Sequence, residues 1–406
     1  MELLFLYNNM RLLRHLLYFI TIALIISACK TAKPVQKTVL KTQHVKNDTL
    51  PDIEPVLLTI KGDTLKRLDS VVAIGIHRLI KDTVSVVGVG DIMMGTNFPK
   101  AEYLPPNKGK DLLAAAKPFL ENADITFGNL EGVILDEGGT PKYCKNPDIC
   151  YAFRSPEYLL GNLTDAGFDV MSMANNHAGD FGNIGRKNTQ RVLDSIGIRH
   201  AGLINKPYST FIIDGMKYGF AAFAPNTGTM SINDLPRAKE IVQHLDSISD
   251  IVIVSFHGGA EGKKYQHVTR KRETFYGENR GNVYEFAHQL IDVGADVIFG
   301  HGPHVVRATE VYKKRFIIYS LGNFCTYARF NLSGANRLAP IIKIFTNAKG
   351  EFLYGNIFSF NQYRPGGPVL DENNAAAKKI KALTAKDFPE SVINIDENGN
   401  IKYITH

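Results

Sequence analysis

The chain has little of several features that would assign it to a common class of protein. Its 47 Lys and Arg residues exceed its 40 Asp and Glu residues, which gives a formal net charge of +7. No concentrated basic block marks a nucleic-acid-binding surface. No internal repeat is present, which argues against solenoids and propellers. The hydrophobic content of 44% and the charged content of 21% are ordinary, so we expect a globular protein with a sizeable core.

Cysteine is also scarce, with four in 406 residues. Cys144 and Cys150 lie close together in a loop, so an exported protein could join them in a disulfide, although sequence alone does not show that their side chains meet. Cys325 is expected to be an unpaired packing residue.

Long hydrophobic runs are missing as well. Arg11 and Arg14 precede an apolar run from Leu16 to Ile26, which is too short for a comfortable membrane span and ends in small residues before Cys29. This pattern resembles the lipobox of a bacterial lipoprotein signal peptide, which implies cleavage before Cys29 and attachment of a diacylglyceryl group to its sulfur. We therefore expect a membrane-anchored lipoprotein of the cell envelope, facing outside the cytoplasm. The alternative is an uncleaved anchor helix with an incidental cysteine.

The composition along the chain predicts its organisation. Residues 1–28 form the signal peptide, and residues 29–82 form a tether and N-terminal extension rich in Lys, Thr, Gln and Val. A compact domain is expected over residues 83–330. Residues 331–406 are expected to complete it with strands and a charged tail that begins at Asp371.

Within the compact domain, short apolar segments alternate with segments of helical spacing, which predicts an α/β fold with mainly parallel strands. A hairpin over residues 210–223 and strands after residue 339 are expected to be antiparallel, so a mixed sheet or two sheets between helices would fit. Five predicted strands end in Asp, Asn, Glu or His, and they cover residues 84–90, 123–127, 168–173, 251–256 and 295–299. Ligands of open α/β sheets bind beyond the carboxyl ends of the strands, so we expect one convergent polar site.

The polar residues at these strand ends are candidate metal ligands. They are Asp91, Glu131, Asn176, His257, His301 and His304. Mixed oxygen and imidazole ligands suit Mn, Fe or Zn rather than Ca. Each residue has a structural alternative, because an Asp can cap a segment, an Asn can hold a turn and a single His is more often packed or exposed. Their recurrence at strand ends favours a shared site.

Two residues have candidate catalytic roles. His177, beside Asn176 and near Asp180, could protonate a leaving group, and its alternative is a loop histidine bonded to backbone. Glu261, four residues past His257, could act as a base, support a metal ligand or be an ordinary loop carboxylate.

Candidate substrate contacts are Asn129, Arg307 and Asn323. Arg307 could meet an anionic substrate. Lys263 and Lys264 could do the same, although solvated surface charge is the simpler interpretation of these two lysines.

Six short motifs, in order along residues 84–330, resemble the motif set of the bacterial capsule synthesis CapA family, the poly-gamma-glutamate biosynthesis proteins. The motifs are Gly90–Met93, Gly128–Glu131, Asn175–His177, His257–Glu261, Gly300–Val305 and Ser320–Phe324. That family is similar to the calcineurin-like metallophosphoesterases, whose fold is a four-layer αββα sandwich with a dinuclear metal site. The resemblance implies that Asp91, Asn176, His257, His301 and His304 bind metal and that His177 lies beside the scissile group.

The chain departs from the phosphoesterase pattern in three motifs. Asp91 is not followed by a His two residues later, and Asn129 stands where a bridging Asp is usual, with Glu131 two residues on. The late histidines are three apart rather than two. A site with one metal ion, or a reorganised pair using Glu131 and Glu261, is therefore expected.

Two functions from different classes follow. The first is a lipid-anchored, metal-dependent hydrolase that attacks a phosphoester or an amide of an anionic polymer such as poly-gamma-glutamate, in the biosynthesis of a capsule or surface polymer. The second is a non-catalytic envelope component that binds the polyanion and helps to export or anchor it with capsule synthesis membrane proteins. Neither function involves nucleic acid.

Overall fold

The computed structural model describes residues 81–143 and 150–404. The expected signal peptide, Cys29, nearly all of the tether and the expected partner of Cys150 lie outside these ranges. Cys325 is free and buried, as expected. All the described residues belong to one compact unit of the chain.

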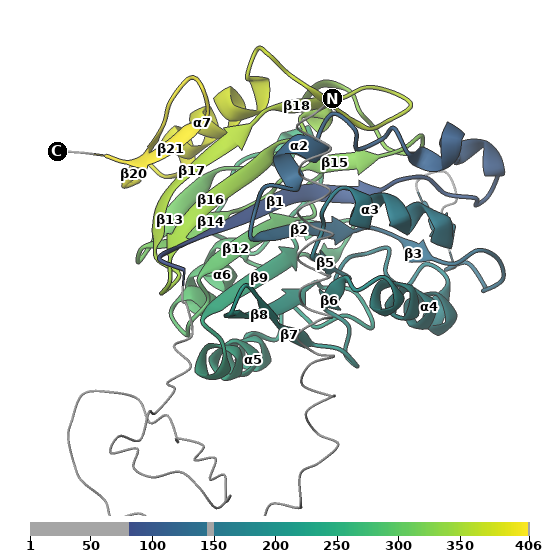
Figure 1. Ribbon diagram of the computed structural model, residues 1–406, viewed down its shortest axis with the longest axis horizontal. Helices are drawn as coiled ribbons and strands as arrows, with labels where there is room; N and C mark the ends of the chain where they lie inside the picture. Colours follow the sequence, from purple (N-terminus) through teal and green to yellow (C-terminus); the bar gives the residue numbers. More distant parts are fainter. Residues whose placement is uncertain (1–80, 144–149, 405–406) are drawn as a thin grey trace, which may run out of the picture. The chain divides into compact units, whose positions relative to one another are not determined.

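Two β-sheets form the centre of this unit (Figure 1). The larger has nine strands in the order β20 (Ile393–Ile395), β21 (Asn400–Tyr403), β17 (Phe352–Phe358), β16 (Ile341–Asn347), β1 (Thr83–Met93), β2 (Ile125–Leu130), β5 (Val170–Ser172) and β6 (Arg199–Ala201), with β15 (Asn323–Thr326) paired to β1. The smaller has six in the order β13 (Thr309–Tyr312), β14 (Arg315–Ile318), β12 (Val297–His301), β9 (Ile251–His257), β8 (Met216–Phe223) and β7 (Tyr208–Ile213). The neighbours β1, β2, β5 and β6 are parallel, as are β8, β9, β12 and β14.

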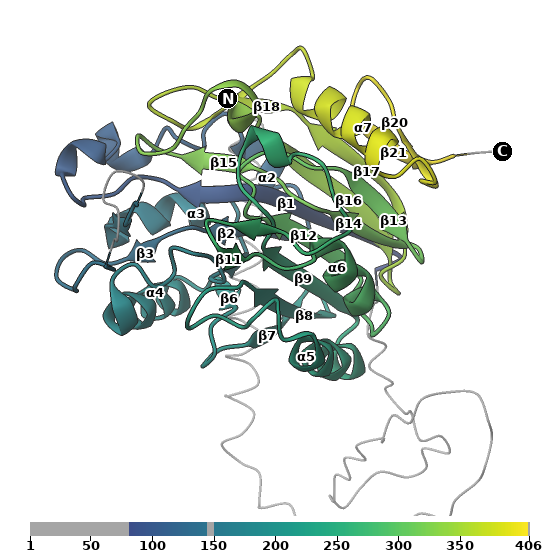
Figure 2. The same cartoon turned by 180° about the vertical axis from the view of Figure 1, so that it is seen from behind.

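Helices cover the outer faces of both sheets, as Figure 2 shows from behind for the smaller one. The helices are α2 (Lys117–Leu120), α3 (Gly161–Asp165) and α4 (Gly182–Ser195) on the larger sheet, α5 (Leu235–Ile248) and α6 (Val283–Ile291) on the smaller sheet, and α7 (Ala375–Asp387) against β17 and β13. The four-layer αββα sandwich is thus confirmed. Within the described ranges, no helix is long and apolar enough to cross a membrane.

Strand β1 is buried on both faces because it lies between the outer helices and the second sheet. Val84 and Val86 face the core shared with the smaller sheet, whereas Val87 and Val89 face the core under α2 to α4. Because both faces of β1 are buried, its sequence is a continuous apolar run. A half-buried strand would instead alternate apolar and polar residues.

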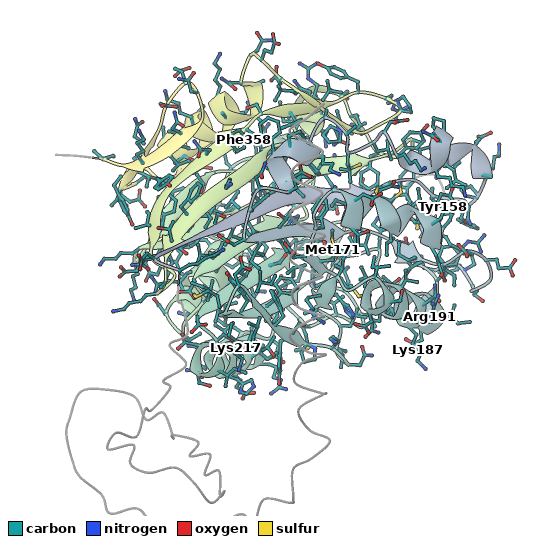
Figure 3. The ribbon with its side chains drawn as sticks, in the orientation of Figure 1. Tyr158, Met171, Lys187, Arg191, Lys217 and Phe358 are labelled. Atoms are coloured by element: carbon teal, nitrogen blue, oxygen red, sulfur yellow. The ribbon has the colours of Figure 1, made fainter. Side chains whose placement is uncertain are left out.

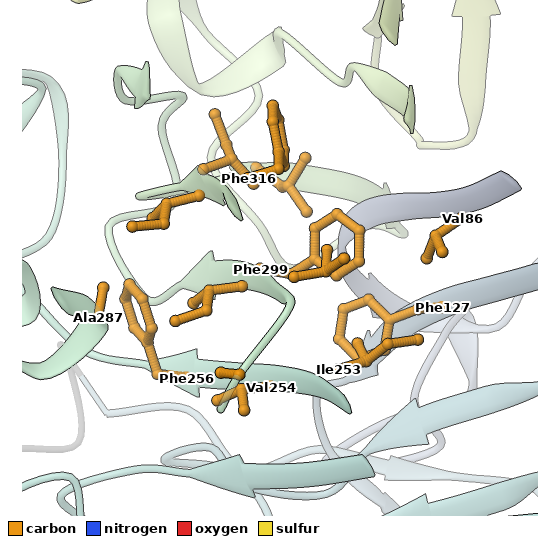
Figure 4. Close-up of a cluster of buried hydrophobic side chains, with 14 of the residues drawn as sticks. Val86, Phe127, Ile253, Val254, Phe256, Ala287, Phe299 and Phe316 are labelled. Atoms are coloured by element: carbon orange, nitrogen blue, oxygen red, sulfur yellow. The ribbon is translucent and has the colours of Figure 1, made fainter. Parts of the chain in front are cut away.

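The two sheets pack through aromatic rings (Figure 4). Phe127 of β2 stacks on Phe299 of β12 with ring centroids 5.2 Å apart. A Cβ atom at Gly88 would lie 2.3 Å from a ring carbon of Phe299. The sheets can therefore approach at this point because position 88 has no side chain.

The outer helices have amphipathic sequences because one face of each is buried against a sheet. Helix α4 buries Thr189, Val192 and Leu193 and exposes Lys187 and Arg191 (Figure 3). Helices α5 and α6 begin at capping residues whose side chains accept hydrogen bonds from backbone N–H groups three residues on. The capping residues thus mark where α5 and α6 begin, and the buried apolar residues mark the face that packs on the sheet.

Shorter elements complete the unit. They are β3 (Val133–Ile134), β4 (Arg154–Ser155), β10 (Thr274–Phe275), β11 (Glu278–Asn279), β18 (Phe360–Gln362), β19 (Pro368–Leu370) and 3₁₀ turns at Ala101–Tyr103, Pro106–Gly109, Glu157–Leu160, Lys263–Tyr265 and Gly334–Arg337. The segment after Asp371, expected as a charged tail, contains α7, β20 and β21.

We predict that Gly88→Ala lowers the free energy of unfolding by about 1–3 kcal/mol, because the added methyl group overlaps the Phe299 ring. Urea unfolding followed by circular dichroism measures the change. Gly161→Ala is the control, because no atom lies within 4 Å of its Cβ position. Equal stabilities for the two variants would contradict the proposed packing constraint.

Candidate metal centre

The carboxyl ends of parallel strands from both sheets bring four candidate residues to one edge. Asp91 and Asn129 are register partners near the ends of β1 and β2. His257 and His301 are the last residues of β9 and β12 and are also register partners.

A bulge aims the side chain of Asp91. The pairing of β1 with β2 shifts between Gly88 and Asp91, and its pairing with β15 shifts directly after Asp91. Such irregularities bend a strand and redirect a side chain. A Cβ atom at Gly90 would lie 2.1 Å from the carbonyl oxygen of Gly322, which directly precedes β15. The chain can approach β1 this closely only because Gly90 has no side chain. The Asp91 amide donates to that carbonyl at 2.9 Å.

Asp91, Glu131 and His304 form a cluster in which one ligand atom from each lies within 4.8 Å of the others. His304 Nδ1 lies 3.0 Å from Asp91 Oδ2, and His304 Nε2 lies 3.6 Å from Glu131 Oε1. His304 has a φ of 54°, which is uncommon for a residue with a side chain. Asn336 donates to the His304 carbonyl at 3.0 Å and holds this conformation.

Several buried polar atoms around this cluster have no hydrogen-bond partner among the described residues. They are both carboxylate oxygens of Glu131, Asn176 Oδ1 and both ring nitrogens of His257. The ring centroids of His257 and His304 are 6.1 Å apart. Buried polar atoms without partners cost about 1–3 kcal/mol each, so native sites seldom leave them unpaired. These oxygen and imidazole donors fit a divalent cation such as Mn, Fe or Zn.

The electrostatics of the cluster are strongly coupled. Burial alone would raise the pKa of Asp91, but the hydrogen bond and charge of His304 hold it below its usual range. Burial and the charge of Asp91 raise the pKa of Glu131 well above its usual value. Burial disfavours protonated His304, yet the charges of Glu131 and Asp91 raise its pKa to about 10. The two carboxyl groups therefore favour positive charge at this point of the cluster, which a bound cation would also supply.

His177 lies beside the cluster and is oriented by Asp180. His177 Nδ1 lies 2.7 Å from Asp180 Oδ2, and its Nε2 faces Glu131 Oε1 at 3.9 Å. Lys142 forms an ion pair with the other carboxylate oxygen of Asp180 at 2.6 Å. Burial lowers the pKa of His177, so the ring is neutral at rest and Nε2 is the atom left to exchange a proton.

Asn129 and Asn175 link the strand ends. Asn129 donates to Asp91 Oδ1 at 2.8 Å and accepts from Asn175 Nδ2 at 3.1 Å. Asn175 also accepts from the backbone N–H of His177 at 3.1 Å. The Asn129 side chain is fully buried in this network, so it orients Asp91 instead of lying on a substrate surface. Asn323 Oδ1, by contrast, lies 3.1 Å from His304 Nδ1 and lines a cavity.

Glu261 stands at the outer side of the cluster. Its Oε2 lies 4.0 Å from His304 Nε2, and its Oε1 forms an ion pair with Arg280 Nη2 at 3.0 Å. Arg280 is 2% exposed and also donates to the Gly259 carbonyl at 3.1 Å. Glu261 is therefore held near the cluster by a buried guanidinium.

His301 and Arg307 are not brought into the cluster. His301 Nε2 lies 3.0 Å from the carbonyl oxygen of Val89, and its ring packs on Phe127 between the sheets. Arg307 is fully buried and forms two hydrogen bonds with Glu273, at 2.8 and 2.7 Å. Their polar atoms are engaged inside the protein, so the ligand and substrate sets proposed below omit both.

Sequence reasoning missed residues that support or cover the site. Arg280 and Lys142 come from loops without a motif, so no local signal distinguished them from solvated charges. Phe153 packs on His177 with ring centroids 4.3 Å apart, and Phe330 packs on His304 at 5.7 Å. Asn175 was within a motif, and only its buried contacts show its structural role.

The chain belongs to the bacterial capsule synthesis family PGA_cap, whose family model matches residues 85–328. The capsule biosynthesis protein CapA of Bacillus anthracis is 28% identical over 310 residues, which cover 71% of this chain and 70% of that protein. The PGA biosynthesis protein CapA of Bacillus subtilis (strain 168) is 30% identical over 264 residues, which cover 60% of this chain and 63% of that protein. The chain thus spans about two thirds of the length of both relatives.

Solved structures with a similar arrangement include a hypothetical protein from Thermus thermophilus, with a TM-score of 0.42 and 15% identity over 68% of this chain and 99% of that one. The calcineurin-like phosphoesterase YfkN from Bacillus subtilis has a TM-score of 0.39 and 13% identity, over 76% of this chain and 98% of that one.

We predict that Glu131→Gln stabilises the metal-free protein by roughly 1–2 kcal/mol and abolishes stabilisation by Mn²⁺ or Zn²⁺. The substitution removes a buried carboxylate whose oxygens have no hydrogen-bond partner among the described residues. Because the pKa of Glu131 is raised on folding, its cost grows as pH rises above the unfolded value, so the advantage of the variant should also grow. Thermal unfolding at several pH values, with and without metal, measures both effects.

Glu273→Gln is the matched control for this prediction. Glu273 is a buried carboxylate too, but it is paired with Arg307, so its loss should lower stability with and without metal. If Glu131→Gln behaved like Glu273→Gln, Glu131 would be a structural residue.

Proposed function

We propose that this protein is a metal-dependent hydrolase of the cell envelope, which cleaves a phosphoester or amide bond in an anionic surface polymer of the poly-gamma-glutamate type. The observation that carries the proposal is the set of buried atoms on Glu131, Asn176 and His257, without hydrogen-bond partners in the described chain, around the Asp91–His304 pair. Membership of the capsule synthesis family supports the biological setting.

The residues that would hold the cation are Asp91, Glu131, Asn176, His257 and His304. The chemistry supplied by such a cation is Lewis-acid polarisation of a phosphoryl or carbonyl oxygen and a lower pKa for water. Asn129 and Asn175 keep Asp91 and the His177 loop in place through the hydrogen bonds described above. The protein thus supplies a rigid set of donors, which is what precise positioning of a substrate requires.

His177 would accept a proton from the attacking water at Nε2 and then donate it to the leaving group. With Nδ1 held by Asp180, the Nε2 atom is directed at the cluster and can accept or return a proton. Phe153 and Phe330 stack with ring centroids 5.2 Å apart and contact His177 and His304. This apolar cover would exclude water and strengthen charge interactions within the site.

We predict that His177→Ala lowers kcat about 10²- to 10⁴-fold with little change in bound metal, because the ring moves a proton and is outside the ligand set. Hydrolysis of bis-p-nitrophenyl phosphate and of poly-gamma-glutamate by the metal-loaded protein measures kcat, and elemental analysis measures metal. His200→Ala is the control, because His200 is buried and pairs with the exposed Asp194 outside the site. It should leave kcat unchanged per folded molecule.

Absence of hydrolysis in the metal-loaded wild type would contradict the enzyme proposal. Polymer binding that persisted without turnover would instead support the export or anchoring component. Failure to bind any divalent metal would remove the basis of both the ligand set and the chemistry.

We propose further that a lipid on Cys29 tethers the protein to the membrane, as the lipobox-like sequence indicates. Cys29→Ser is predicted to abolish incorporation of labelled palmitate in bacterial cells and to keep the precursor unprocessed. Cys325→Ser is the control, because this buried thiol should leave labelling unchanged. Equal labelling of the Cys29→Ser variant and wild type would exclude lipidation at this residue.

A further inference from the structure

Two adjoining cavities lead away from the candidate metal centre. The inner one, of about 250 Å³, is lined by His304, Asn323 and Phe330. The outer one, of about 680 Å³, is lined by residues 262–265 and 274–276 on one side and by Asn331 and Ser333 on the other. Both share Glu261, Gly262, Phe275, Asn331 and Asn336. We call this continuous path the lysine groove, because Lys263 and Lys264 line its outer part.

The groove offers positive charge that is not already neutralised. Lys263 and Lys264 are exposed, and neither forms an ion pair with any residue in the described part of the chain. The one carboxylate that lines both cavities, Glu261, is paired with Arg280 at 3.0 Å. The ammonium groups of Lys263 and Lys264 are therefore available to an anionic ligand, because the neighbouring Glu261 carboxylate forms its ion pair with Arg280.

The turn that carries the lysines is fixed to the protein interior. Arg307 Nε donates to the Tyr265 carbonyl at 2.8 Å, while the rest of its guanidinium binds Glu273. Gly262 donates to the Pro303 carbonyl at 2.8 Å, next to His304. A buried ion pair is costly unless its hydrogen bonds are complete, and here they hold one surface turn in place. The backbone that carries the lysines is thus held in place beside the candidate metal centre.

The opposite wall carries neutral hydrogen-bonding groups. Asn331, Ser333 and Asn336 line it, and Asn336 also fixes His304 through the carbonyl contact described above. Amide and hydroxyl groups suit the amide bonds of a polymer backbone. No arginine lines either cavity, so the fork that recognises phosphate bidentately is missing from the described walls.

We propose that the lysine groove binds an extended polyamide chain with carboxylate side groups, held by Lys263 and Lys264 while a backbone bond lies at His304. This inference rests on the proposed function, because it takes the metal centre as the reacting end of the groove. It assigns recognition of the polymer to two residues outside the metal centre. Binding and cleavage should therefore be separable by mutation.

The test uses the full chain in detergent, loaded with Mn²⁺, and a variant in which Lys263→Ala and Lys264→Ala are combined. Fluorescence anisotropy with labelled poly-gamma-glutamate of defined length should show about tenfold weaker binding and a smaller dependence on salt. KM for the polymer should rise by a similar factor, with kcat and the hydrolysis of bis-p-nitrophenyl phosphate unchanged. The matched control replaces the adjacent lysines Lys378 and Lys379 of α7, which line neither cavity.

Each outcome decides a separate point. Polymer affinity equal to that of wild type and the α7 control would overturn the lysine groove, even if the wild type hydrolyses phosphodiesters. Weaker binding by the variant in a protein without turnover would uphold the groove and contradict the hydrolase proposal. Polyphosphate that binds more tightly than poly-gamma-glutamate, and loses affinity in the same variant, would overturn the assignment to a polycarboxylate.

Discussion

The hydrogen bond between Asp91 and His304 joins the two halves of the molecule at its candidate centre. Asp91 comes from β1 of the larger sheet, and His304 comes from the loop after β12 of the smaller sheet. The contact therefore requires the two sheets to pack at one separation, which the Phe127–Phe299 stack over Gly88 fixes. A change in sheet packing far from the edge would be transmitted to the distance between these two residues.

The cluster also shows why such a site works against stability. Within the described chain, Glu131 has two buried oxygens without hydrogen-bond partners, and His257 has two buried nitrogens without them. A sequence selected only for stability would replace these groups with apolar or paired ones. Their presence next to the hydrogen-bonded Asp91–His304 pair is understandable if a cation restores the missing interactions when it binds.

Much of the fold could be predicted from the sequence, because buried parallel strands produce continuous apolar runs. The runs before Asp91 and His257 correspond to β1 and β9, and the hairpin predicted over residues 210–223 corresponds to β7 and β8. The segment after Asp371 was not predicted to contain elements, because α7 is lysine-rich and its burial depends on contacts with distant strands.

The site was harder to predict because the sequence shows which residues are polar, but not where their atoms point. His301 and His304 are three residues apart in one motif, yet His301 bonds to Val89 between the sheets while His304 turns toward Asp91 through a left-handed backbone conformation. The sequence predicted that Arg307 could bind an anion, but in the structure this side chain is buried and paired with Glu273.

The contacts of Arg307 separate the part of the loop that must stay constant from the part that can vary. Its guanidinium binds the loop at Ala260, Tyr265 and Glu273, whereas residues 263 and 264 are exposed to solvent and take no part in this anchor. Descendants of this chain could exchange those two side chains without disturbing the anchor or the proposed metal ligands. The architecture would thus let the proposed hydrolytic centre be redirected among polymers of different charge during evolution.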